Sequence, residues 1–177
     1  MTKRQEYKVL QSFRDFEVRE YLPCVLAQVK VSANYESASS MAFAPLFKYI
    51  SQGNKTSEKI AMTAPVTLSA AQQGGDMSSA NKWRVHFVMP GKYTMTNIPL
   101  PNNAEVKLRE IPGKLFAVHS FTGFNSVSRV QTKSDELLAW LQSKNFKPLS
   151  SVQLSRYDPP WTLPMFRRNE IMVEIEQ

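Results

Sequence analysis

Residues 58–67 read EKIAMTAPVT, and this stretch decides how the rest of the chain can be arranged. It is apolar and uncharged after its first two residues. Pro65 disfavours a helical conformation at Ala64, so a helix cannot run through the stretch. We therefore expect an extended segment here. Residues 156–161, RYDPPW, form a similar Pro-containing stretch near the end of the chain.

Three short strands and a helix precede the first stretch. Residues 7–10, 16–21 and 24–31 have strand character, with a turn at Arg14 and Asp15. Apolar residues then recur at helical spacing over residues 33–51, with three serines (37, 39 and 40) available as N-caps. Pro45 predicts a kink or a late start of this helix, and residues 53–54, Gly-Asn, predict its end.

The elements that follow occur in the same order as those before. Residues 69–82 predict a mobile hairpin loop containing Gly74–Asp76, residues 83–89 alternate as a strand, and residues 90–104 form a connector with three prolines. Strands are then expected at 105–111 and 114–121, a helix at 126–144 with Asn145 as its C-terminal cap, and closing strands at 152–157 and 171–176.

The two halves resemble each other in detail. Residues 18–21, VREY, match residues 108–111, LREI, at a shift of about 90. With one inserted residue, Leu46, Phe47, Tyr49 and Ile50 fall on Leu137, Leu138, Trp140 and Leu141. We predict an internal repeat of residues 7–89 and 105–176 within a single domain, 1–177. Each half is too small to bury a helix and a sheet alone, so the sequence predicts an α+β fold in which duplicated ββαββ halves close into a distorted antiparallel β-barrel flanked by two helices.

Composition limits the classes of function. The chain has 177 residues, a formal charge of +7 and one cysteine, Cys24, which excludes an intrachain disulfide and a cysteine-based metal cluster. The charge favours anionic partners, but the basic residues are scattered, so we do not expect nucleic acid as a partner. No apolar run is long enough to cross a membrane, and residues 1–6 lack the apolar region of a signal peptide. We expect a soluble, cytoplasmic protein; its oligomeric state does not follow from the sequence.

Several motifs together resemble the SOUL haem-binding protein family. These are residues 58–67, the preceding helix end at 48–50, the run FVMP at 87–90, and RYDPPW at 156–161 followed by RRNE at 167–170. The resemblance extends from about residue 7 to residue 176. It implies a barrel of two duplicated halves, similar to the effector-binding domains of some bacterial regulators. It also implies binding of haem or another tetrapyrrole.

The resemblance carries over only some of the family's binding residues. The histidine that one branch is proposed to use as a haem ligand is matched here by Glu20. In another branch the tetrapyrrole rests on an apolar cleft beside the first helix. Phe43 and Phe47 match its apolar positions and Lys48 its basic one. Two further basic positions of that branch are matched by Ser40 and Thr162.

The residues themselves suggest how a tetrapyrrole would be held. A planar apolar ring with two carboxylates needs an apolar slot and cations at its edge. Met41, Phe43, Phe47 and Met62 are the candidates for the slot, and Lys48 is the candidate cation. The alternative is that Met and Phe residues at helical spacing simply belong to the core.

Histidines and carboxylates offer other chemistry. His119, and less so His86, could ligate haem iron, although a lone histidine on an apolar strand face is more often hydrogen-bonded in place. Glu20 and Glu110, each beside an arginine, could share acid–base work or simply form two ion pairs at the barrel rim. Nothing like a nucleophile elbow surrounds Cys24. We assign no catalytic residue and no metal cluster.

The sequence therefore favours a non-catalytic protein that binds haem or a related tetrapyrrole reversibly, for buffering or delivery. Two alternatives remain open at this point. One is an enzyme of the same fold that acts on the bound tetrapyrrole, for instance by releasing iron. The other is a sensor-like binder of amphipathic organic ligands.

Overall fold

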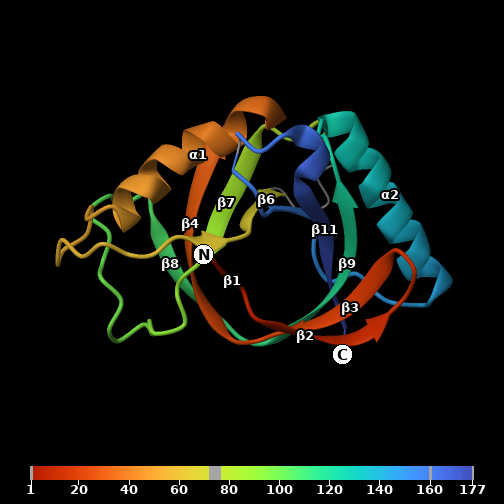
Figure 1. The fold of residues 1–177 in the computed structure, drawn as a ribbon, viewed down its shortest axis with the longest axis horizontal. Helices are drawn as coiled ribbons and strands as arrows, with labels where there is room; N and C mark the ends of the chain where they lie inside the picture. Colours follow the sequence, from red (N-terminus) through yellow and green to blue (C-terminus); the bar gives the residue numbers. More distant parts are fainter. Residues whose placement is uncertain (1, 72–76, 160, 177) are drawn as a thin grey trace.

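Nine strands form one antiparallel sheet that curls into an open barrel, and two helices pack against its outer surface (Figure 1). The computed structural model describes residues 2–71, 77–159 and 161–176. The large sheet consists of β2 (Tyr7–Ser12), β3 (Phe16–Tyr21), β4 (Cys24–Ser32), β6 (Val66–Ala70), β7 (Lys82–Val88), β8 (Lys107–Ile111), β9 (Lys114–Thr122), β10 (Gln153–Arg156) and β11 (Arg168–Ile175). The helices are α1 (Tyr35–Ile50) and α2 (Val127–Ser143). The expected α+β class is confirmed.

The order of the strands follows the predicted repeat. The sheet runs β2-β3-β9-β11-β10-β6-β7-β4-β8. Without β2, this order maps onto itself in reverse when each strand is exchanged for its counterpart in the other half. At the centre Leu68 on β6 pairs with its own counterpart, Leu154 on β10. Superposition of residues 7–89 on 105–176 stays a prediction, but the topology is the one that such a repeat requires.

The core lies between the sheet and the helices because strand residues alternate between the two faces. On β7, Trp83, Val85 and Phe87 are buried, as the alternation predicts, and Met89 beyond the strand end is also buried. On α2, Val130, Leu137 and Leu141 are buried. The other face of the sheet lines the inside of the barrel.

Helix α1 lies within the expected range, residues 33–51, but it is capped by a different residue than the sequence suggests. Asn34, and none of the three serines, is the N-cap: its side-chain oxygen accepts a hydrogen bond from the backbone nitrogen of Ser37 at 2.9 Å. The helix runs through Pro45, so the predicted late start is wrong. Proline removes only the hydrogen bond to the carbonyl four residues earlier, and that residue, Met41, is half exposed, where water can replace the bond.

The ends of the two helices depend on residues with left-handed backbones. After α1, Gln52 has φ +78°, and Gly53 N–H donates to the carbonyl of Lys48 at 2.9 Å. A side chain at Gly53 would lie only 2.4 Å from that carbonyl oxygen, so glycine is required for the close approach. After α2, the C-cap is Lys144, and the predicted capping residue Asn145 lies directly beyond it with φ +60°, where it ends the helix.

The stretch at residues 58–67 is extended from Thr63 onward. The extended part begins with β5 (Thr63–Ala64). A cis peptide joins Ala64 to Pro65, and β6 follows. β5 pairs in parallel with β1 (Lys3–Arg4), and Gln5 N–H donates to the carbonyl of Ala64 at 3.0 Å. The N-terminal strand therefore crosses the open side of the barrel (Figure 1), an addition that the sequence did not predict.

The predicted hairpin between β6 and β7 is confirmed by their antiparallel pairing, from Val66 with Phe87 to Ala70 with Trp83. The Gly74–Asp76 turn lies outside the described residues. After it, Met77 is buried against the core.

Candidate functional site

An apolar surface lies beside α1, between the helix and the strands that follow it. Phe43 and Phe47 are one helical turn apart, so their side chains lie on the same stripe of α1. Their rings stack with centroids 5.5 Å apart and planes inclined by 19°. Met62, just before β5, lies against the same stripe, and all three side chains are between 42% and 50% exposed. We call Phe43, Phe47 and Met62 the α1 patch.

The α1 patch covers a narrow crevice that leads down to the core. Its walls also include Leu46 and Ile50 of α1, Val66 of β6 and Phe87 of β7. The crevice holds only about 10 Å³, whereas pockets that enclose a small-molecule ligand are typically about 300–1,000 Å³. A planar ligand would therefore lie on the aromatic pair, in contact through one face.

Met41 and Lys48 lie on a different stripe of the helix. Successive helical residues are rotated by about 100°, which places Met41 and Lys48 on a common stripe, away from that of Phe43 and Phe47. Both side chains are exposed, and neither lines the crevice. The structure thus brings together three of the five predicted slot and edge residues. Lys48 lies in the last turn of α1 but does not line the crevice.

A second cation near this end of α1 was missed by the sequence reasoning. Lys59 is exposed, and its backbone pairs with Ser51, the C-cap residue of α1. This pairing places Lys59 at the end of the helix that also carries Lys48. The sequence feature that could have pointed to Lys59 is its position three residues before Met62, within the stretch at residues 58–67.

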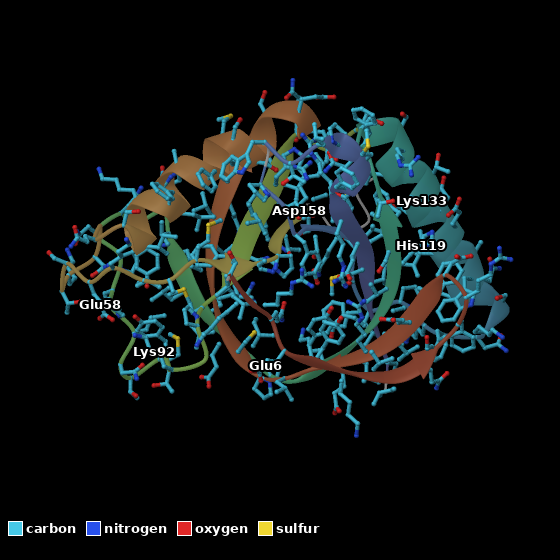
Figure 2. The ribbon with its side chains drawn as sticks, in the orientation of Figure 1. Glu6, Glu58, Lys92, His119, Lys133 and Asp158 are labelled. Atoms are coloured by element: carbon cyan, nitrogen blue, oxygen red, sulfur yellow. The ribbon has the colours of Figure 1, made fainter. Side chains whose placement is uncertain are left out.

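His119 lies on the other side of the molecule, on β9 beneath α2 and near Lys133 (Figure 2). It is buried, and both ring nitrogens are engaged: Nδ1 with the carbonyl of Asp15 at 2.9 Å and Nε2 with a carboxylate oxygen of Glu136 at 2.7 Å. Its ring also packs on that of Phe16 at 4.6 Å. Iron ligation needs a free nitrogen lone pair, so the arrangement gives His119 a structural role that ties α2 to the sheet.

A cluster of charged and phenolic side chains occupies the inside of the barrel. Glu170 of β11 is fully buried and accepts hydrogen bonds from Arg19 at 2.9 Å, Tyr157 at 2.7 Å and Arg168 at 2.7 Å. Arg19 also donates to Tyr21 at 3.0 Å. We call Arg19, Tyr21, Tyr157, Arg168 and Glu170 the Glu170 cluster.

The charges of the Glu170 cluster are balanced by partners within the cluster. Burial alone would raise the pKa of Glu170, but the hydrogen bonds and charge of Arg19, with Tyr157 and Arg168, outweigh burial and lower it. Burial, reinforced by the Glu170 charge, raises the pKa of both Tyr21 and Tyr157. The carboxylate therefore stays ionised and compensated, which leaves it little capacity to pair with a ligand cation. Sequence reasoning missed this cluster because its members are up to 151 residues apart.

The other ionisable candidates are not assembled into a reactive site. Glu20 on β3 and Glu110 on β8 belong to strands at opposite ends of the repeat-related order, and among the described residues no ion pair involves either carboxylate. Burial, together with the charge of Arg109, lowers the pKa of His86 to about 4. Burial also raises the pKa of the Cys24 thiol, which disfavours the reactive thiolate.

The described part of the chain contains no convergent group of three His, Cys, Asp or Glu side chains that could hold a metal ion. It also contains no helix that is long and apolar enough to cross a membrane. The α1 patch is thus a surface that could hold an apolar ring by its face. The Glu170 cluster is a satisfied internal network.

Comparison with known sequences points to one family. The sequence model described as SOUL heme-binding protein matches residues 2–174. Heme-binding protein 2 of Homo sapiens is 30% identical over 117 residues, which cover 66% of this chain and 56% of that protein. The Mus musculus protein of the same name is 29% identical over the same extent. The match spans only a little over half the length of these curated relatives.

Comparison with solved structures shows the same fold at much lower identity. The crystal structure of the EcmrR C-terminal domain has a TM-score of 0.69 at 14% identity and covers 97% of this chain and 98% of that one. A crystal structure described as a hydrolase from Listeria innocua has a TM-score of 0.61 at 12% identity, with 94% of both chains covered. These neighbours support the barrel architecture alone.

Proposed function

Because this chain belongs to the SOUL heme-binding protein family, we propose that it binds haem or a related tetrapyrrole reversibly on the α1 patch, for buffering or delivery of the ligand. The observation that carries the proposal is the exposed, stacked pair Phe43 and Phe47, with Met62 beside it. In a protein of ordinary composition, large apolar side chains that gather on one surface indicate an interaction site.

The shape of the α1 patch suits a ligand held through one face. The two stacked rings are each about half exposed, and together with Met62 they offer apolar contact to a flat macrocycle. The crevice beneath them is too small to admit a ring. Contact on one side leaves much of the ligand exposed, and this favours reversible binding over permanent retention.

In this proposal, cations at the end of α1 would pair with carboxylates at the ligand's edge. Lys48 lies in the last turn of α1, and Lys59 is placed beside the C-cap by its pairing with Ser51. Charge-assisted contacts with propionates would each contribute about 1.5–3 kcal/mol when desolvated and less at this exposed edge. His119 is not part of the proposed site because its two ring nitrogens are already engaged. Binding of the ring would then not depend on iron.

The proposal is tested by titration with haem, followed by absorption, and with metal-free protoporphyrin, followed by fluorescence. We expect saturable binding of both, with similar affinities. Phe47→Ala should weaken both by about tenfold, since a partly buried aromatic contact is lost. The matched control is Leu138→Ala, which truncates the exposed residue at the equivalent position of α2 and should leave both affinities unchanged.

Other outcomes would select other functions. Recovery of free iron with metal-free porphyrin would replace reversible binding with an enzymatic reaction on the tetrapyrrole. Absence of saturable binding, or an equal effect of Phe47→Ala and Leu138→Ala, would overturn the proposed site. Binding of amphipathic organic ligands in place of tetrapyrroles would support the sensor-like alternative.

A further inference from the structure

Two loops meet at the end of the barrel where both helices begin. One joins β9 to α2 at residues 123–126, and the other joins β10 to β11 at residues 157–167. Gly123 N–H donates to the carbonyl of Arg167 at 3.1 Å, and Asn169 donates to the carbonyl of Gly123 at 3.0 Å. Tyr35, the first residue of α1, donates to the carbonyl of Asn125. The loops are thus held together as one surface.

This surface carries an unusual concentration of exposed apolar side chains. The five most exposed large apolar residues of the described chain all lie on these two loops, with exposed fractions between 59% and 84%. They are Phe124, Trp161, Leu163, Met165 and Phe166. We call these five residues the loop patch. None of them belongs to the α1 patch.

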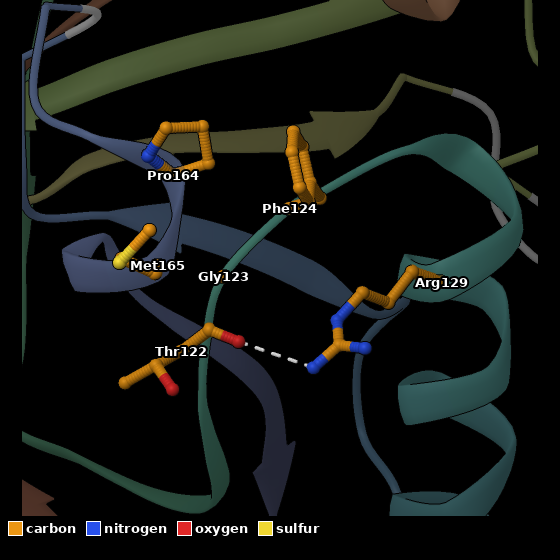
Figure 3. A pocket seen from close by; sticks show the side chains of 6 residues that line it. All are labelled: Thr122, Gly123, Phe124, Arg129, Pro164 and Met165. Carbon is orange, nitrogen blue, oxygen red and sulfur yellow. Dashed lines mark hydrogen bonds between the residues drawn. The ribbon is translucent and has the colours of Figure 1, made fainter.

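A wide, shallow hollow separates the two loops. Figure 3 shows Phe124 and Met165 on its two sides, with Pro164 beside Met165 and Arg129 at the edge. The hollow has a volume of about 400 Å³ and is open to solvent. Its only drawn hydrogen bond joins Arg129 to the carbonyl of Thr122 at 3.1 Å. The guanidinium of Arg129 is therefore anchored at the rim of an apolar depression.

The described residues of the longer loop, 157–159 and 161–167, form hydrogen bonds within the loop. Thr162 N–H donates to the carbonyl of Pro159 at 3.0 Å, and Phe166 N–H to that of Leu163 at 2.9 Å. The guanidinium of Arg167 donates back to the carbonyl of Thr162 at 2.8 Å. A loop that is already ordered loses less conformational entropy on binding than a flexible loop does. The apolar side chains are therefore presented in advance of any contact.

The charges around the loop patch are mostly positive. Residues 111–134, which contain the shorter loop, and residues 159–169, which contain most of the longer one, include no Asp or Glu but carry Arg129, Arg167 and Arg168. Asp158, the one acidic residue of the longer loop, accepts a hydrogen bond from the backbone nitrogen of Arg168 at 2.6 Å. The N-termini of α1 and α2 add partial positive charge at this end. Glu36, in the first turn of α1, is an acidic residue that offsets part of it.

We propose that the loop patch docks the protein on the surface of an anionic lipid bilayer. Trp161, Phe166 and their neighbours enter the headgroup–acyl boundary, while Arg129 and Arg167 contact lipid phosphates. Exposed Trp, Phe and Leu combined with Arg is the composition of interfacial membrane anchors, and the excess of positive charge on the two loops matches an anionic surface. A folded protein partner would call for acidic groups facing these arginines. On a second copy of this chain, the acidic residue of these loops is Asp158, which already accepts a hydrogen bond from Arg168. The proposal is independent of tetrapyrrole binding.

The test is co-sedimentation of the full chain, without haem, with vesicles of phosphatidylcholine alone or mixed with phosphatidylserine. We expect binding to the mixed vesicles that weakens with added salt. Phe166→Ala or Trp161→Ala should lower the partition coefficient about tenfold, and Arg129→Gln about fivefold on anionic vesicles. Leu100→Ala, a similarly exposed leucine on the connector, should have no effect.

Tryptophan fluorescence identifies the inserted residue. Trp83 is fully buried and Trp140 stacks on Phe16, so the emission change on vesicle binding should come from Trp161. Trp161→Phe should keep most of the binding but lose the blue shift. Equal binding to both kinds of vesicle, or equal losses in the Leu100→Ala protein, would overturn the proposal. So would a dimer, detected by light scattering, that Phe166→Ala dissociates, because the loop patch would then be a self-association surface.

Discussion

The two halves of the chain place equivalent helices on equivalent strands, yet their outer faces differ. Leu46 and Ile50 of α1 are buried, and so are their counterparts Leu137 and Leu141 of α2. Outside these positions the helices diverge: α1 exposes Met41, Phe43 and Phe47, whereas α2 exposes mainly polar and charged side chains, including Asp135 and Glu136. The inward positions are apolar in both helices because they pack against the sheet. The outward residues do not pack against the sheet, and the proposed function uses the apolar set that α1 exposes.

The inside of the barrel shows a second difference between the halves. Glu170 pairs with Ser155 across β10 and β11, and Arg84 pairs with Ser69 at the equivalent place in β6 and β7. Glu170 is the centre of a buried network, whereas Arg84 is partly exposed and donates to the carbonyl of Ala71 at 3.3 Å. A single position in the repeat has thus become a structural anchor in one half only.

The largest effect should come from breaking that asymmetry. Glu170→Ala leaves the buried guanidinium of Arg19 without its main partner and should lower the free energy of unfolding by about 3–5 kcal/mol. Arg84→Ala, at the equivalent position, should cost about 1 kcal/mol or less. Urea unfolding followed by circular dichroism measures both. Similar losses in the two variants would mean that the network around Glu170 is not the anchor.

A smaller effect should appear in the pH dependence of stability, because the first half has His86 where the second half has Met172. His86 has a pKa of about 4 in the fold, below its ordinary 6.5, so between these values the unfolded chain binds a proton that the folded chain does not. The stability of the wild type should therefore fall as pH decreases from about 6.5 to about 4, by up to about 3 kcal/mol from this group. His86→Met introduces the residue type at the equivalent position, Met172, and should flatten this part of the profile.

The control for this experiment lies at more acidic pH. The pKa of Glu170 is lowered in the fold, so its contribution is lost only as pH falls through that lowered value. This acidic loss should persist in His86→Met. A profile from pH 6.5 to pH 4 that is unchanged by the substitution would contradict the assignment to His86.

The smallest effect concerns the starts of the two helices. Asn34 caps α1 with a hydrogen bond of 2.9 Å, whereas Ser126 caps α2 with one of 3.4 Å. Asn34→Ala should cost about 1 kcal/mol and Ser126→Ala about half of that, both measured by thermal or urea unfolding. A larger loss for Ser126→Ala would show that the α2 cap depends on contacts other than this bond.

Much of the fold could be predicted from local patterns. Alternation located the strands, helical spacing located α1 and α2, and Asn145 marked a helix end, because each depends on residues close in sequence. The exceptions were also local in cause. Asn34, and not one of the three nearby serines, caps α1. Pro45 is tolerated because the carbonyl that it leaves without a hydrogen bond belongs to Met41, which is half exposed to solvent.

The candidate site was predictable only in part. Phe43, Phe47 and Met62 were named from the resemblance and from their chemistry, and the structure places them together on one surface. Their exposure could not be read from the sequence, since Phe residues at helical spacing suit a core equally well. Met41 was assigned to the same slot and Lys48 to the ligand's edge, but the rotation of the helix puts both on another stripe.

The sequence by itself determined the kinds of elements, their order and the family, since these depend on short-range periodicity and on contiguous motifs; the repeat stays a prediction from the same patterns. Only the tertiary structure decided which side chains meet. Glu136 takes up one nitrogen of His119, Arg19 reaches Glu170 across 151 residues of chain, and two distant loops combine into the loop patch. Such contacts follow from strand pairing and barrel closure, and no local pattern encodes which residues closure brings together.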